Sequence, residues 1–376
     1  MKVKYCVLLI IVFGACTKPY VANIKGQSVG FLVVEGYINV SGTTTIHMSR
    51  STGLDSPQYI PELGAQLVIE SNNGGSIPLT EAGNGVYSVD GLNLDPTSQY
   101  RLQILTAGKE YLSDLSTVNI TPPIDSVNWT ANSSGVNIFV STHNDLVQPG
   151  YYQWSFNETW EYNSGYSSDL EYQNSELIAR PLQDLIYTCW RTDSSTNIAI
   201  SNTEKLSSNV VYQYPLTQIP FDNTNKMTVK YSILVKQTSL SKDWYEWVQK
   251  IQRNTEQLGS IFDAQPSETG GNIHCTTDPT EMVIGFIGTT TETEQRIFIR
   301  RSQLPFARIY TGYESCTLNT SGLDPASLAS EFSTGFYIPV QLVYANGIAV
   351  GVTSSSPDCV DCRVQGGTLT KPDFWQ

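Results

Sequence analysis

A closely spaced pair of cysteines near the end of the sequence is the pattern with the clearest capacity for chemistry. Cys359 and Cys362 form a C-x-x-C motif that precedes a Gly-Gly pair, in a segment rich in Ser, Pro and Gly. Such a pair can bind zinc, cycle as a redox dithiol or form structural disulfides. Zinc would need a second closely spaced ligand pair, and a thioredoxin-like dithiol would follow a strand and open a helix. The sequence has neither pattern, so structural disulfides are favoured and no metal site is predicted.

The first residues indicate the compartment, which decides whether disulfides are to be expected. Two lysines precede a short apolar run, and Gly14 and Ala15 stand directly before Cys16. A basic start, a short apolar run and small residues are typical of a secretory signal peptide, and a Cys at this point is typical of a bacterial lipoprotein. Residues 1–15 are therefore predicted to be a signal peptide and residues 16–27 a tether that is lipidated at Cys16. An ordinary secretory signal with an incidental Cys is the alternative.

Export makes disulfides stable, because they persist in oxidising compartments. The sequence has seven cysteines, and removing Cys6 of the signal peptide and the lipidated Cys16 leaves five. An odd number means that at least one cysteine is free or pairs outside the chain. The five are Cys189, Cys275, Cys316, Cys359 and Cys362.

Composition limits the class of partner. The chain has 376 residues, a net charge of −13 and only 15% charged residues. Nucleic acid and anionic membrane both require clustered Lys and Arg, so the net charge argues against either as a partner. A chain of this length accommodates two or three domains. Its abundance of Tyr, Ser, Thr, Asn and Gly is typical of exported β-proteins.

The first part of the mature chain has the pattern of a small β-sandwich. Between residues 31 and 114, short segments rich in β-branched and aromatic residues alternate with turn signals, among them the Asn-Asn-Gly-Gly run at 72–75. Turns at this regular spacing are typical of antiparallel sandwiches. An immunoglobulin-like or fibronectin-like domain is therefore predicted over residues 28–122.

A second β-rich domain is predicted over residues 123–376. It carries one amphipathic helix near 241–258, capped by Ser241, and a hairpin formed by 281–288 and 294–301. Residues 260–275 have the composition of a loop. The Ser/Pro/Gly-rich tail would fray without a covalent tie, so it is predicted to be held by disulfides.

Motifs for catalysis are missing from the sequence. It lacks G-x-S-x-G, H-E-x-x-H, a phosphate-binding loop and G-x-G-x-x-G. Asp169 and Glu171 could form a glycosidase-type carboxylate pair, but 35 acidic residues produce close pairs by chance. The chain is predicted to be non-enzymatic and to need no cofactor.

Aromatic residues crowd between positions 151 and 172. Tyr162, Tyr166 and Tyr172 lie around a predicted hairpin tip, where exposed rings would suit sugars or protein interfaces. They are the candidate contact surface. Three other aromatic residues alternate along one strand and are expected to fill the core: Tyr152, Trp154 and Phe156.

Several blocks together resemble a known family. "LVVEGYIN" (32–39), "YSILVKQTSLSKDWYEW" (231–247), "GSIFDAQPS" (259–267) and "CVDCRVQGGTLTKPDFW" (359–375) occur in that order. The chain resembles the domain of unknown function 4249 family of Bacteroidota lipoproteins, which has no established activity. Genes of that family commonly lie beside TonB-dependent outer-membrane transporters of the starch-utilisation type.

The resemblance also implies a role for four of the cysteines. Cys189, Cys316, Cys359 and Cys362 match the family pattern, whereas Cys275 is an addition. We expect Cys359 and Cys362 each to bond to a distant partner, Cys316 and Cys189, in either order.

The resemblance implies an outer-membrane lipoprotein that is a binding or accessory subunit beside a TonB-dependent transporter barrel in nutrient uptake. Its ligand would be a carbohydrate or a peptide. Whether the protein faces the surface or the periplasm stays open, because Thr-Lys-Pro-Tyr rather than acidic residues follow Cys16. The alternatives are a structural subunit of an envelope assembly and, third, a carbohydrate-active enzyme with two carboxylates facing a cleft.

Overall fold

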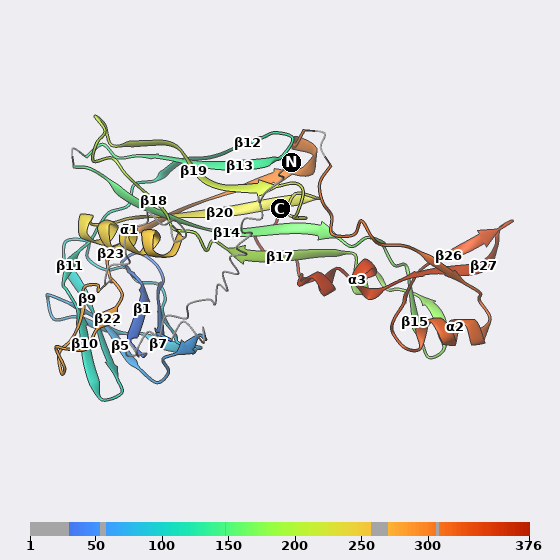
Figure 1. Ribbon diagram of the computed structural model, residues 1–376, viewed down its shortest axis with the longest axis horizontal. Helices are drawn as coiled ribbons and strands as arrows, with labels where there is room; N and C mark the ends of the chain where they lie inside the picture. The colour runs from blue at the N-terminus through green and yellow to red at the C-terminus, as the bar shows by residue number, and fades with distance from the viewer. Residues whose placement is uncertain (1–29, 53–57, 147, 257–269, 306–307) are drawn as a thin grey trace, which may run out of the picture.

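The chain forms two β-sandwiches and a protruding arm, arranged along an elongated molecule (Figure 1). The computed structural model describes residues 30–52, 58–146, 148–256, 270–305 and 308–376. The predicted signal peptide, tether and lipidated Cys16 lie outside these residues. The predicted mainly β fold is confirmed, with strands supplying most of the secondary structure.

The N-terminal sandwich packs two sheets face to face around buried aliphatic and aromatic side chains. One sheet has the order β22-β1-β3-β8-β7, with β4 beside β3, and the other has the order β21-β10-β9-β5-β6, with β11 beside β9. The first contains β22 (Val283–Ile284), β1 (Leu32–Gly36), β3 (Thr44–Arg50), β8 (Val86–Val89), β7 (Thr80–Gly83) and β4 (Ile60–Pro61). The second contains β21 (Ile273–Cys275), β10 (Lys109–Ser113), β9 (Gln99–Thr106), β5 (Gln66–Ser71), β6 (Ser76–Pro78) and β11 (Ser116–Thr117).

A late segment of the chain returns to this sandwich, which corrects two sequence predictions. β22 pairs in parallel with β1, and β21 pairs antiparallel with β10, so the sandwich extends beyond residues 28–122. The predicted hairpin between 281–288 and 294–301 is wrong, because its first half joins β1 instead. Part of the predicted loop at 260–275 is the strand β21. Two further short strands pair in parallel at the junction, β2 (Ile38–Asn39) and β23 (Thr289–Thr290).

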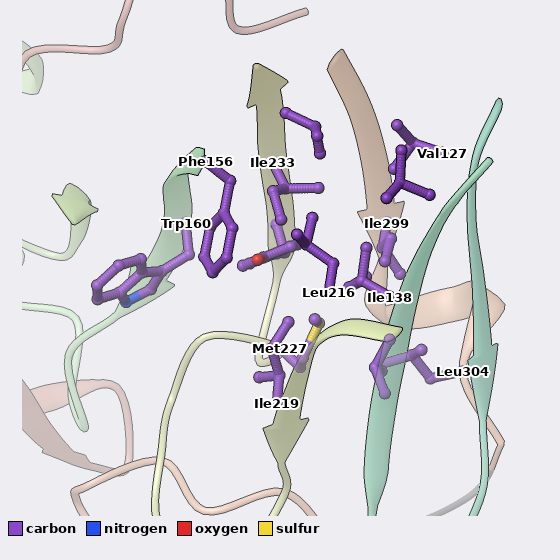
Figure 2. Packing of buried hydrophobic residues seen from close by; sticks show 14 of the residues in the cluster. Val127, Ile138, Phe156, Trp160, Leu216, Ile219, Met227, Ile233, Ile299 and Leu304 are labelled. Atoms are coloured by element: carbon purple, nitrogen blue, oxygen red, sulfur yellow. The ribbon is translucent and has the colours of Figure 1, made fainter. Parts of the chain in front are cut away.

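The central sandwich places a sheet of order β12-β13-β19 against a sheet of order β17-β14-β20-β24, with β18 beside β14. Side chains from both sheets meet in its core, where Ile138 and Leu216 lie opposite Phe156 and Ile233 (Figure 2). The strands are β12 (Ile124–Ala131), β13 (Gly135–His143), β19 (Val210–Pro220), β17 (Thr188–Ser194), β14 (Tyr151–Asn163), β20 (Lys230–Ser239), β24 (Glu292–Arg300) and β18 (Ala199–Asn202). Tyr152, Trp154 and Phe156 are buried here, as predicted.

The predicted amphipathic helix is present as α1 (Lys242–Glu256), and its predicted last residues lie outside the described part of the chain. The Ser241 hydroxyl accepts a hydrogen bond from the Trp244 N–H at 3.2 Å, which caps the first turn. The Trp244 ring is stacked on Phe286, with centroids 6.2 Å apart. Because Phe286 follows β22, this contact joins the helix of the central sandwich to the N-terminal sandwich.

The arm extends from the end of β14 and the start of β17, away from the N-terminal sandwich (Figure 1). It combines a two-stranded β15-β16 hairpin, a β25-β27-β26 sheet and a short helix packed around its own small core. Its elements are β15 (Leu170–Gln173), β16 (Glu176–Ala179), β25 (Asn319–Ser321), α2 (Pro325–Phe332), β26 (Ile338–Ala345) and β27 (Ile348–Ser355). The remaining helices are α3 (Pro357–Val360), η1 (Leu182–Asp184), η2 (Arg301–Gln303) and η3 (Cys362–Gln365).

Candidate functional site

The C-x-x-C motif forms two structural disulfides, the double staple at the base of the arm. Cys362 is bonded to Cys189 of β17, and Cys359 is bonded to Cys316, with Cα atoms 5.7 and 5.8 Å apart. The expectation that each reaches a distant partner is confirmed, and the order is now fixed. Cys275 is free and buried. Within the described residues, no group of three or more His, Cys, Asp or Glu could hold a metal ion.

Tyr162 does not belong to an exposed contact surface, which corrects that prediction. Only 1% of the residue is exposed, and its hydroxyl donates a hydrogen bond to the Cys362 carbonyl oxygen at 2.8 Å. The cause is that β14 continues to Asn163, so Tyr162 falls on the inward face and the tail covers it. Burial raises the pKa of the Tyr162 hydroxyl above its usual value.

Tyr166 and Tyr172 are half-buried and also face inward. The Tyr166 hydroxyl donates to the Cys316 carbonyl oxygen at 3.0 Å, and the Tyr172 ring lies 5.6 Å from the Phe332 ring of α2. The sequence pattern could not reveal this, because the tail and α2 that cover the rings are distant in sequence. The three tyrosines therefore form an internal seam between β14, the tail and the arm.

The exposed apolar side chains of the arm lie on a different element, the β26–β27 hairpin and the loop before it. Exposure reaches 74% at Phe336, 63% at Tyr344, 70% at Ile348 and 53% at Val350. The sequence carries a signal for this surface, since no charged residue occurs from 332 to 357. In a chain with 35 acidic and 22 basic residues, so long an uncharged segment is unusual.

The backbone of this hairpin is also open at its tip. β25 pairs with β27 only from Val352 to Ser354, so residues 348–350 have β26 as their sole partner strand in the described structure. Asn346 and Gly347 both have positive φ, 51° and 80°, as a tight two-residue hairpin turn requires. Exposed strand edges are usually protected by charges or proline. Here an apolar, uncharged hairpin presents open edges to its surroundings.

A polar cleft of about 440 Å³ lies beside the staple, over Trp160 of β14. The Arg191 guanidinium and the Lys226 ammonium lie 5.5 and 4.9 Å from the centroid of the Trp160 ring. Lys226 also forms an ion pair with Glu158, whose other oxygen accepts the Tyr231 hydroxyl at 2.5 Å. Burial, with Glu158 adding to it, raises the pKa of Tyr231 well above its usual value. Both oxygens of the Glu158 carboxylate are thus engaged structurally.

A second polar cleft, of about 610 Å³, lies where the two sandwiches meet, and Glu292 and Glu294 line it. Glu292 accepts hydrogen bonds from the Tyr37 hydroxyl and from Lys236, the latter at 2.9 Å. Burial, followed by the charge of Glu292, raises the pKa of Tyr37 far above its usual value. Glu292 therefore links a residue of the N-terminal sandwich to β20. It holds a junction together rather than facing a free substrate.

The carboxylate pair that the sequence offered for glycosidase chemistry lies elsewhere. Asp169 and Glu171 belong to the arm, beside and within β15, and line none of the clefts described above. Glu171 lies 3.5 Å from Arg180 in an ion pair. In the described part of the chain, no helix is long and apolar enough to cross a membrane.

The strand pairing defines a mainly β protein of two sandwiches with a disulfide-tied arm. The family described as Domain of unknown function (DUF4249) matches residues 17–296, which is most of the chain, and the chain belongs to this family. Among curated proteins none matches.

Two of the solved structures that align with parts of the chain come from a vertebrate protein and a bacterial adhesin. A two-domain fibronectin type III segment of chicken tenascin is 11% identical, with 57% of this chain and 92% of that chain covered and a TM-score of 0.16. The Yersinia pseudotuberculosis adhesin InvE is 16% identical, with 46% and 57% covered and a TM-score of 0.14. Both scores are too low to indicate a shared overall architecture, so the fold rests on strand pairing.

Proposed function

We propose that this chain is a lipoprotein, anchored in the outer membrane through Cys16, that acts as a non-enzymatic binding or accessory subunit beside a TonB-dependent transporter in nutrient uptake. The observation that supports this most is the uncharged β26–β27 hairpin, because it combines exposed apolar side chains with open backbone edges at the end of a braced arm. Such a surface suits a partner protein better than a reacting substrate.

The chemistry of the hairpin favours a β-structured partner. An added strand can satisfy the open N–H and C=O groups, while side chains such as Tyr344 and Ile348 supply apolar contact area. Aromatic and aliphatic anchors of this kind contribute most of the energy of protein interfaces. The barrel and extracellular strands of a transporter offer both features.

The proposal is tested by affinity purification from native membranes. The wild-type chain should retain a transporter barrel, and the double variant Tyr344→Ser, Ile348→Ser should lose it. Tyr212→Ser is the matched control, because Tyr212 is 76% exposed on β19 of the central sandwich. Recovery of envelope proteins without any barrel would favour the structural-subunit alternative. Equal recovery of the barrel with all three proteins would refute the role of the hairpin.

A further inference from the structure

A basic pocket of about 560 Å³ lies on the outer face of the central sandwich, where β20 begins and β24 turns into η2. It brings Lys230 next to Arg300 and Arg301, which lie about seventy positions further along the chain. Its polar lining comes from Lys230, Arg300, Arg301, Ser302, Thr228 and Glu161.

Two cations of the pocket oppose each other directly. Lys230 of β20 and Arg300 of β24 are cross-strand partners, so their side chains leave the same face of the sheet. Like charges at such a position repel and destabilise the pairing. Lys230 is also only 9% exposed. Burial, and next the charge of Arg300, lower the pKa of Lys230, whereas Glu161, which is its cross-strand partner on β14, acts in the opposite direction.

Contacts within the chain offset the positive charges of Lys230 and Arg300 only in part. The Lys230 ammonium donates to the main-chain oxygen of Gln376 and lies 4.7 Å from the centroid of the Phe298 ring. Glu161 is the acidic residue that lines the pocket, and one of its oxygens already accepts the Trp375 indole N–H at 2.9 Å. Arg300 is exposed and forms no ion pair within the described residues.

We propose that this pocket binds a phosphate-type oxyanion, either free phosphate or the phosphate of a lipid headgroup. An Arg guanidinium offers a planar fork that bonds two phosphate oxygens at once, and Lys adds a point charge. The Ser302 hydroxyl can donate to a third oxygen. The chain carries −13 overall, so attraction acts only at short range, since salt screens charges beyond about 8 Å. An anion at this position removes the repulsion between Lys230 and Arg300.

The test uses a substitution whose effects with and without phosphate have opposite signs. Arg300→Gln removes one of two repelling charges from an exposed position, so the variant without phosphate should melt at the wild-type temperature or higher. Added inorganic phosphate should raise the melting temperature of the wild type and leave that of the variant unchanged. In calorimetric titration the variant should bind phosphate ~10-fold or more weakly. Arg253→Gln, which loses the same charge on exposed α1, should bind as the wild type does.

Sodium chloride at the same ionic strength replaces phosphate as the blank in the melting and titration experiments. Vesicles of phosphatidylglycerol and of phosphatidylcholine then separate the sources of the phosphate. Retention on phosphatidylglycerol that Arg300→Gln abolishes assigns a lipid headgroup, and binding of inorganic phosphate without vesicle retention assigns free phosphate. The proposal is overturned if the wild type neither binds inorganic phosphate nor is retained on phosphatidylglycerol vesicles. Equal phosphate binding by Arg300→Gln and wild type also overturns it. The outcome does not depend on the transporter proposal, since no hairpin residue is involved.

Discussion

Removal of the Cys316–Cys359 disulfide should loosen the arm while both sandwiches stay folded. The residues between these two cysteines contain β25, α2, β26 and β27, so the closed loop is most of the arm itself. The other bond, Cys189–Cys362, encloses this loop and continues to hold the tail on β17. The perturbation is the double replacement of Cys316 and Cys359 by Ala, which leaves no new thiol.

The sequence separation of the two cysteines sets the magnitude. The bond closes 43 residues, for which the chain-entropy relation gives about 4 kcal/mol. The outer bond spans 173 residues, for which it gives about 5 kcal/mol. Since the smaller loop is nested within the larger, the two values do not add. With the outer bond intact, about 4 kcal/mol is therefore an upper value for the arm.

The assay is limited proteolysis across a urea series, with cleavage sites mapped by mass spectrometry. At a slope of about 1–2 kcal/mol per molar, the urea midpoint for cleavage within the arm should fall by up to about 2–4 M. The midpoints of the sandwiches should stay within error of wild type. Cys275→Ala is the control, because it removes a buried sulfur that forms no disulfide. If the arm is cleaved at the wild-type midpoint, or if the sandwiches unfold with it, the reasoning is wrong.

Two further substitutions have defined outcomes. Tyr162→Phe removes the hydroxyl that donates to the buried Cys362 carbonyl, so the free energy of unfolding should fall by about 1–3 kcal/mol in urea titration; an unchanged value would mean that water replaces the hydroxyl. Cys16→Ser should abolish labelling by a fatty-acid precursor and release the protein from the outer-membrane fraction, and a variant that still carries the label would contradict the lipoprotein proposal.

Local patterns in the sequence predicted the class of element well. Alternating and aromatic-rich segments became strands, and the residues from Lys242 were predicted to be helical because Trp244 and Val248 recur at helical spacing. Which strands pair with each other was harder to predict. Val283 and Ile284 have an ordinary strand pattern, and nothing local distinguishes pairing with β1 from pairing with the next strand along the chain.

The candidate site was predictable only where covalent chemistry fixes it. The C-x-x-C motif and the resemblance together pointed to two long-range bonds, and both exist. The prediction of an exposed tyrosine surface was wrong because segments distant in sequence cover the side chains. The carbonyl oxygen of Cys362 accepts the Tyr162 hydroxyl, and that of Cys316 accepts the Tyr166 hydroxyl. The basic pocket was invisible for the same reason, since Lys230 and Arg300 are neighbours only through sheet pairing.

The most direct test of the transporter proposal is photo-crosslinking in native membranes from position 348 of the hairpin. A photoreactive residue in place of Ile348 should yield a covalent adduct with a TonB-dependent transporter barrel. The same residue in place of Tyr212, which is at least as exposed and lies on the central sandwich, should yield none. Absence of a barrel adduct from position 348, or equal adducts from both positions, would contradict the account.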